Sequence, residues 1–347
     1  MIFTRIIRGK MLVATLASLL ASVQGRADDT RFLPDGCVGV FSIDLANFLT
    51  SKMYPKGSDP LQIGHEMDRL VRASGVPSSN LDRLTLGVDI NNDDGRREIY
   101  VVTTLKPITP EQIKSEIKYG NHIKNVEYTE IRVGKHVIYE PRYQYHIGKE
   151  LIPNYDLFQA FCVVAEKKAI YGPSERLKIV LDRKKATFSV GVETELKSNG
   201  LNDAFISALD IRAISAYKRS QLKQMAEAVP GLSDLLEGIH TVSLRGNEKN
   251  RFHCTATVWC KDAIYAAKVK KVADAGVVLL KELFKDSEDR SAERRKMNKA
   301  MHDVLNAVRL SVVGSQVLFE VSVDPVTAIN ALAGLVPGET KKSPEPR

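Results

Sequence analysis

A repeated eight-residue pattern is the feature of this sequence that most restricts its fold. Residues 133–140 and 313–320 both follow the order Val, Gly, two variable residues, Val, aliphatic, aromatic, Glu. Because a chain that repeats itself folds as similar units, each copy should form a unit of about half the chain. We therefore predict two tandem repeats, at residues 28–185 and 186–338, followed by a disordered tail at 339–347.

The two copies align over their opening elements. Residues 40–45 and 206–211 alternate as a β-strand does, and each carries an aspartate at the same place, Asp44 and Asp210. Helical spacing follows each strand, and a β-hairpin comes next. The hairpin is expected over 84–90 and 97–105 in the first copy and over 239–245 and 251–260 in the second, where an offset of 155 brings Leu81, Asn92, Arg96 and Lys106 onto identical residues.

The remainder of each copy predicts a second helix and a closing hairpin. Thr109 and Gln112 form a capping box around Pro110, which marks a helix start. In the second copy this helix becomes a long charged helix or helix pair over residues 262–308. The closing hairpins should bend at Gly134 and Gly314, and short helices should start near Pro173 and Pro325.

These elements give the order β-α-β-β-α-β, with an extra strand and helix in each copy. The first six elements are those of the ferredoxin-like sandwich, in which an antiparallel sheet packs on helices. We therefore predict an α+β fold built by internal duplication of a ferredoxin-like unit. Two inserts break the symmetry, one at residues 141–160 and a charged helical one at about residues 285–299.

The first 27 residues have the composition of a secretory signal peptide. Three basic side chains precede an apolar run at residues 11–23, and the small residues Gly25 and Ala27 precede a cut before Asp28. The run is shorter than the roughly 20 residues that cross a bilayer, although an uncleaved anchor is the alternative. We predict a mature protein that is secreted or periplasmic, within the cell envelope, with no transmembrane segment after cleavage.

Cleavage of the signal peptide lowers the formal positive charge of the protein. The chain has a formal charge of +8, and removing four of its 50 basic residues with the signal peptide leaves 46 against 42 acidic residues. A balance of this size does not make a nucleic-acid footprint, which needs basic residues concentrated on one face. The densest run, at residues 288–296, mixes both signs and favours a solvated helix face.

The positions of the four cysteines allow one disulfide bond but do not require it. Cys254 and Cys260 are expected on one face of a single strand, about 20 Å apart and beyond disulfide reach, as small buried side chains. A bridge between Cys37 and Cys162 is geometrically allowed in an exported protein, but nothing in the sequence requires it.

No motif in the sequence predicts a metal or a cofactor. Asp89, Asn91 and Asp93 resemble the start of a calcium loop, but the sixth and twelfth positions hold Asp94 and Tyr100 where glycine and glutamate are needed. This segment is better interpreted as a hairpin turn. The sequence contains no phosphate-binding glycine loop, no dinucleotide-binding fingerprint, no G-x-S-x-G and no H-E-x-x-H motif.

Asp44 and Asp210 are the weak catalytic candidates. An unpaired carboxylate inside an apolar strand is costly, so both copies need a reason to keep one. Each could cap the backbone amides of the next segment, or the two could meet as a catalytic dyad across a pseudo-two-fold axis. The sequence favours the caps.

The insert of the first copy carries the candidate binding residues. Tyrosine and arginine anchor many binding surfaces, and a long loop that only one copy has is a common place for binding. The alternative is a hairpin that covers a sheet edge. The candidates are Tyr139, Arg142, Tyr143, Tyr145 and His146.

The signal peptide, the opening at residues 32–35, the strand at residues 42–45 and the paired halves together resemble a loose class of uncharacterised exported bacterial proteins. The resemblance implies export and two tandem ferredoxin-like repeats, and it implies no catalytic residue. We expect a non-enzymatic binding or structural protein of the bacterial cell envelope, whose partner is another envelope protein or a second copy. The alternative is an envelope hydrolase or lyase with a site between the repeats.

Overall fold

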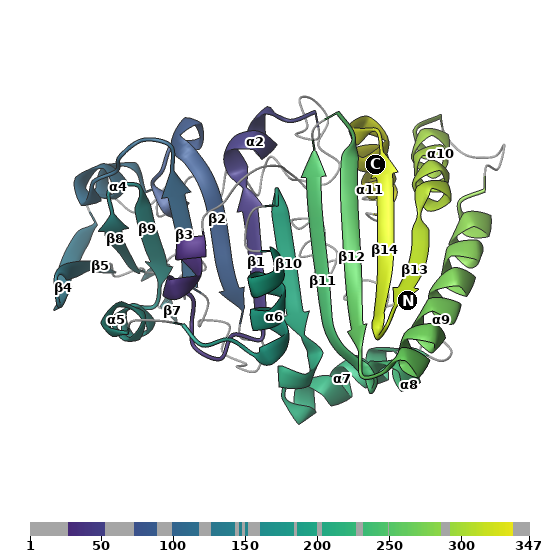
Figure 1. Cartoon of the computed structure of the whole chain (residues 1–347). Helices are drawn as coiled ribbons and strands as arrows, with labels where there is room; N and C mark the ends of the chain where they lie inside the picture. Colours follow the sequence, from purple (N-terminus) through teal and green to yellow (C-terminus); the bar gives the residue numbers. More distant parts are fainter. Residues whose placement is uncertain are drawn as a thin grey trace.

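One antiparallel sheet runs through both halves of the chain in the computed structural model (Figure 1). Its twelve strands follow the order β13-β14-β12-β11-β10-β1-β2-β3-β9-β8-β5-β4. The protein is therefore an α+β fold with a large antiparallel sheet. The structure describes residues 27–52, 73–88, 99–117, 126–142, 146–147, 150–151, 160–183, 186–199, 203–226, 232–248, 250–285 and 292–335.

The first half supplies the strands on one side of the sheet centre. Its elements are η1 (Ala27–Phe32), β1 (Gly39–Asp44), α2 (Leu45–Thr50), η2 (Ser78–Asn80), β2 (Leu81–Val88), β3 (Ile99–Thr104), α4 (Pro110–Glu116), β4 (Glu127–Val133), β5 (His136–Arg142), β8 (Ala160–Ala165), β9 (Lys168–Gly172) and α5 (Ser174–Asp182). The strands β6 (His146–Ile147) and β7 (Glu150–Leu151) pair only with each other.

The second half supplies the strands on the other side. Its elements are α6 (Val190–Asn199), β10 (Phe205–Asp210), η3 (Ile211–Ala213), α7 (Ala216–Ala226), α8 (Leu232–Leu236), β11 (Ile239–Glu248), β12 (Phe252–Cys260), α9 (Ala263–Leu283), α10 (Ala292–Ala307), β13 (Arg309–Val313), β14 (Gln316–Val323) and α11 (Pro325–Leu335). The expected helix pair over residues 262–308 is thus confirmed as α9 and α10.

The two halves meet along β1 and β10, which pair antiparallel at the middle of the sheet. The pairing is reciprocal at its ends, because the amide of Asp44 donates to the carbonyl of Ala204 at 2.8 Å and the amide of Asp210 donates to that of Val38 at 2.7 Å. Outward from this seam the strands follow matching orders, β1-β2-β3-β9-β8 and β10-β11-β12-β14-β13.

Irregular details also match between the halves. The ladder from β2 to β3 shifts register just after Leu81, and the ladder from β11 to β12 shifts just after Ile239. At the ends of β3 and β12, the amides of Thr104 and Cys260 donate to Lys167 and Ser315, in the turns of the hairpins that pair with these two strands. A bulge and a turn contact at the same place in each half fix which strands correspond.

This correspondence corrects two expectations from the sequence. The hairpin at Gly314 matches β8 and β9, not the hairpin at Gly134, because β5 is separated from β3 by β9 and β8. The shared eight-residue pattern reflects turn chemistry instead: both glycines lie in the left-handed region, at φ 57° and 59°, between strand-forming residues. The unmatched part of the first half therefore includes β4 and β5, and is longer than residues 141–160.

The strand order also differs from that of a ferredoxin-like unit. There, the two strands that flank the first helix are separated by another strand. Here β1 pairs directly with β2, and β10 with β11, all antiparallel. Each half thus opens with a three-strand meander, β1-β2-β3 or β10-β11-β12, whose last strand pairs with the second strand of a later hairpin.

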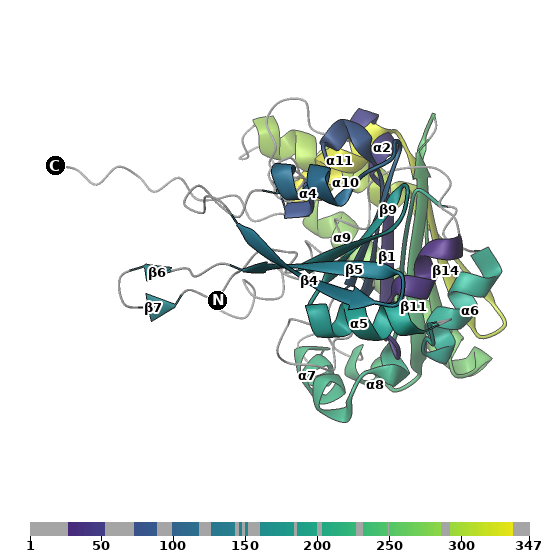
Figure 2. The ribbon, with the colours of Figure 1, turned by 90° about the vertical axis from the view of Figure 1, so that its left-hand side faces the viewer.

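Helices cover both faces of the sheet. On one face α2, α4, α10 and α11 pack on a core that includes Phe48, Phe161 and Phe205, and α9 continues this cover toward β13. On the other face η1 and α5 cover the first half, and α6 lies across the middle of the sheet, against β10 and β11. Figure 2 shows α9, α10 and α11 on the opposite side of the sheet from α6, and the hairpin of β4 and β5 bending away from the body.

Local signals from the sequence are confirmed where the structure describes them. Thr109 and Gln112 form the capping box of α4, with Pro110 at its first turn. The four cysteines are buried and free, so Cys37 and Cys162 form no bridge. Burial raises the pKa of the Cys162 and Cys254 thiols to about 12, so both behave as apolar side chains at neutral pH. Residues 1–26 of the signal peptide predicted at 1–27, the turn expected at 91–95 and the tail expected at 339–347 lie outside the described residues.

Candidate functional site

Asp44 and Asp210 do not form a dyad. They lie at opposite ends of the seam between β1 and β10, and the five residue pairs from Gly39–Leu209 to Ile43–Phe205 separate them. At the usual rise of a strand this places them roughly 20 Å apart. A cleft between the repeats that uses both carboxylates is therefore excluded.

Each aspartate instead caps the backbone after its strand. Asp44 accepts hydrogen bonds from the backbone amide and side-chain amide of Asn47, both at 2.9 Å, at the start of α2. Asp210 accepts from the amide of Gly191 at 2.8 Å, in the first turn of α6, and from the amide of Arg212 at 3.0 Å, in η3. The structural interpretation of the two acids is confirmed.

The pKa values of the two capping carboxyls shift in opposite directions. Burial raises the pKa of the Asp44 carboxyl above its ordinary value, although Asn47 and Arg83 oppose the rise. Burial also acts on Asp210, but hydrogen bonds from Gly191 and Arg212 outweigh it and lower the pKa of that carboxyl. The ionised form is thus favoured by folding at Asp210 and opposed at Asp44.

This contrast predicts opposite pH dependences of stability. Compared with D210N, the wild-type protein should lose stability as pH falls from 3.8 through the lowered pKa of Asp210. Compared with D44N, it should lose stability as pH rises from 3.8 through the raised pKa of Asp44. Urea unfolding of the three proteins between about pH 2.5 and pH 7 measures both differences. Differences that move in the same direction would contradict the two environments.

The candidate binding residues of the first half are placed only in part. Tyr139 is 9% exposed, stacks on Phe161 at a centroid distance of 5.2 Å, and lies under the ammonium of Lys114 at 3.9 Å. Its ring therefore serves the core instead of the predicted contact surface. Arg142 is exposed at the end of β5. Tyr143 and Tyr145 lie outside the described residues, and His146 is described only as part of the β6 backbone.

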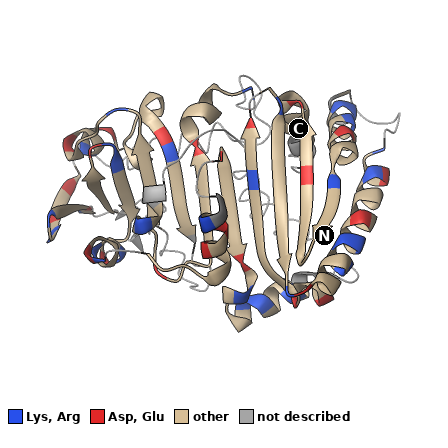
Figure 3. Cartoon of the chain, viewed as in Figure 1, with Lys and Arg blue, Asp and Glu red and all other residues tan. Residues whose placement is uncertain are grey.

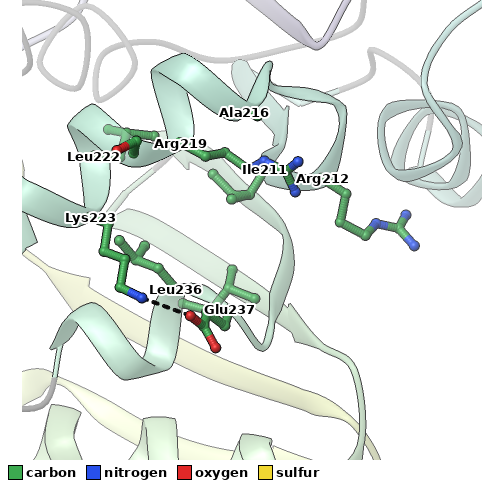
Figure 4. A pocket seen from close by; sticks show the side chains of 10 residues that line it. Ile211, Arg212, Ala216, Arg219, Leu222, Lys223, Leu236 and Glu237 are labelled. Atoms are coloured by element: carbon green, nitrogen blue, oxygen red, sulfur yellow. Dashed lines mark hydrogen bonds and ion pairs between the residues drawn. The ribbon is translucent and has the colours of Figure 1, made fainter.

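A pocket that the sequence did not reveal lies beside the Asp210 cap. It has a volume of about 340 Å³ and is enclosed by η3, α7, the end of α8 and the start of β11 (Figure 4). Its lining residues are Ile211, Arg212, Ala216, Arg219, Ser220, Leu222, Lys223, Leu236, Glu237 and Ile239.

The floor of the pocket is aliphatic. Ile211 and Ile239 are each 9% exposed and belong to the core between β11, β12 and α9, and Leu222 packs against the same core. The chain turns tightly at Gly238, where an added Cβ would lie 1.7 Å from Cδ1 of Tyr265. This close approach seats the end of α8 and the start of β11 against α9, so the floor is fixed by core packing.

The rim of the pocket is charged. Arg212, Arg219 and Lys223 are exposed around its mouth. Lys223 donates to Glu237 at 2.8 Å and lowers the pKa of that carboxyl, while Arg212 contacts Asp210 at 3.4 Å. In Figure 4 the pair of Lys223 and Glu237 lies on one side of the pocket and Arg212 on the other, with Arg219 extending toward Arg212.

The pocket offers recognition groups but no catalytic pair. Its lining contains no histidine or cysteine, and its one hydroxyl group belongs to Ser220. Within the residues that the structure describes, no three His, Cys, Asp or Glu side chains gather to hold a metal ion. The described helices include none that is both long and apolar enough to cross a membrane.

A signal for this site was present in the sequence. Arg219 and Lys223 are four residues apart and flank Leu222 in a segment that follows the conspicuous Asp210. Four-residue spacing places two cations on one helix face. The aliphatic floor, by contrast, comes from η3, α8 and β11, and depends on the tertiary fold.

No family model and no curated protein matches the chain. A solved structure described as "Structure of crystal form I of TP0453" matches with a TM-score of 0.41 and 6% identity, over 90% of this chain and 99% of that one.

Proposed function

We propose that this chain is an exported protein of the bacterial cell envelope that binds a small molecule in the pocket beside α7 and does no chemistry on it. The observation that carries the proposal is the pocket itself, which joins a fixed aliphatic floor to a charged rim. A small number of placed polar groups over apolar walls is the usual composition of a ligand site. The lack of a nucleophile and base in its lining favours binding over catalysis.

Export is supported by the sequence of the first 27 residues, in which basic side chains precede a short apolar run and small residues. The formal charge after cleavage, with 46 basic and 42 acidic residues, fits a protein that does not depend on nucleic acid. In Figure 3 both signs are interspersed along α9 and α10.

We also propose that the two halves arose by duplication of one β-meander unit with helices in its connections. The reciprocal contacts of Asp44 and Asp210 across the seam support this, as do the matching bulges and turn contacts of the two halves. A reciprocal antiparallel pairing is what a two-fold contact between identical copies produces. The duplicated sheet is then the scaffold, and the pocket is a feature of the second half.

Native mass spectrometry on protein recovered from its own cell envelope fraction tests export and binding together. The expected mass is that of a chain starting near Asp28 that carries a stoichiometric small-molecule adduct. A216W should lose the adduct, because its indole fills the pocket, whereas Q224W should keep it, because Gln224 is exposed on α7 outside the lining. An adduct kept by A216W would place binding elsewhere, and a bare wild-type chain would contradict a bound ligand.

A further inference from the structure

The charges around the pocket leave one cation in excess. Three cationic side chains line it, whereas Glu237 is paired with Lys223 and Asp210 lies against Arg212. Arg219 has no ion-pair partner among the described residues and is exposed at the mouth. The site is thus matched to a ligand with a single negative charge.

The free cation is an arginine, which restricts the shape of that charge. A guanidinium presents a planar fork of N–H donors that fits a carboxylate with two parallel hydrogen bonds. The neighbouring Ser220 adds a hydroxyl donor at the exposed rim. A carboxylate therefore satisfies Arg219 without requiring a second unpaired cation, which a phosphate dianion would need.

The floor restricts the rest of the ligand. Ile211, Leu222, Leu236 and Ile239 are aliphatic, and the ten lining residues include no aromatic ring. Nucleobases are commonly held by stacking on aromatic side chains, so a nucleotide finds no platform here. The volume of about 340 Å³ lies near the lower end for ligand sites, which favours a short body.

We infer that the pocket takes a small monocarboxylate with a short aliphatic body, its carboxylate on Arg219 and its chain on the floor formed by Ile211, Leu222 and Ile239. This inference rests on the proposed binding function and names the class of ligand. Because Arg212 is already held by Asp210, and Lys223 by Glu237, Arg219 is the residue that decides the charge preference.

Isothermal titration of the mature full-length protein with hexanoate, hexanamide and inorganic phosphate tests the inference. Hexanoate should bind about tenfold more tightly than its neutral amide, since a charge-assisted hydrogen bond is lost with the amide. From butanoate to hexanoate, affinity should rise about fourfold per methylene, as expected for burial on an aliphatic floor.

Arginine variants locate the charge preference. R219Q should weaken hexanoate binding about tenfold and leave hexanamide binding unchanged, while R219K should recover part of the loss. R295Q is the matched control, because Arg295 is an exposed arginine on α10 outside the pocket, and it should bind as the wild type does. Since Arg219 is exposed, neither substitution should change the melting temperature.

Three outcomes would overturn the inference: equal binding of hexanoate and hexanamide, tighter binding of phosphate, or unchanged hexanoate binding by R219Q. In each case a native adduct lost by A216W would still support the pocket as a binding site, so only the ligand class would fail. Absence of both an adduct and any carboxylate binding would contradict the binding function as well.

Discussion

Replacing Arg83 by methionine is expected to lower the free energy of unfolding by about 3–5 kcal/mol, among the largest effects of any single substitution in this protein. Arg83 is 1% exposed on β2. Its guanidinium donates to the Ser42 hydroxyl and to the carbonyl of Asp203, each at 3.1 Å, and lies 3.7 Å from the Asp44 carboxylate.

The loss of stability in R83M arises mainly from the carboxylate of Asp44, which stays buried without a nearby cation. Methionine keeps most of the apolar stem but removes the charge, so the buried carboxylate of Asp44, 2% exposed, loses the nearby cation and keeps the two hydrogen bonds from Asn47. An uncompensated buried charge is far more costly than a missing pair. The double variant R83M/D44N should therefore be less destabilised than the sum of its single variants.

Urea unfolding at neutral pH measures the four corners of this cycle. R309M is the control, because Arg309 is exposed on the edge strand β13 and its replacement should change stability by less than about 0.5 kcal/mol. A loss below about 1 kcal/mol in R83M, or strict additivity with D44N, would show that Arg83 and Asp44 are not coupled.

The second large effect is expected from Gly246→Ala. An added Cβ at this position of β11 would lie 2.1 Å from Cε1 of Phe205 and 3.0 Å from the carbonyl oxygen of His253. Phe205 is fully buried and stacks on Phe252 at a centroid distance of 6.3 Å. Displacing it from a filled core should cost about 1–3 kcal/mol or more.

Gly276→Ala provides the matched control, because an added Cβ there meets nothing within 4 Å on α9. Alanine in the interior of a helix should raise stability by about 0.5–1 kcal/mol, so the same change should have opposite signs at the two glycines. Thermal unfolding followed by circular dichroism compares them. In the double variant G246A/F205L the smaller leucine leaves room for the new methyl group and should recover part of the lost stability. If G246A lowers the melting temperature equally in the wild-type and the F205L background, the strain does not arise from Phe205.

The sequence predicted local features well because they depend on residues only a few positions apart. The capping box of α4 and the two aspartate caps each join a side chain to a nearby backbone amide, and the glycine turns depend on the backbone conformation of a single residue. The pairing of β1 with β10 joins residues more than 160 positions apart, and no local pattern encodes it. The same limit explains why two similar hairpins, at Gly134 and Gly314, suggested a correspondence that the sheet order does not have.

The same limit applies to the candidate site, where local sequence patterns could be interpreted but contacts between distant elements could not. Tyr139 belongs to a run of aromatic and charged residues that is typical of contact surfaces, but its neighbours Phe161 and Lys114 come from distant elements and bury its ring. The pocket was missed for the converse reason. Its rim is partly readable from α7, whereas its floor exists only once β11 and α8 have been seated against α9.

The seam between β1 and β10 also dictates an order of assembly. The chain is synthesised from its N terminus, so β1 can pair with β2 at once, but its other edge waits until residues 205–210 have emerged. An unpaired strand edge readily joins another chain. Asp44 and Asp210 make matching backbone contacts across the seam, so we expect the open edge of β1 in a nascent chain to pair most readily with β1 of a neighbouring molecule. A chaperone that shields β1 during this interval would then prevent such dimers.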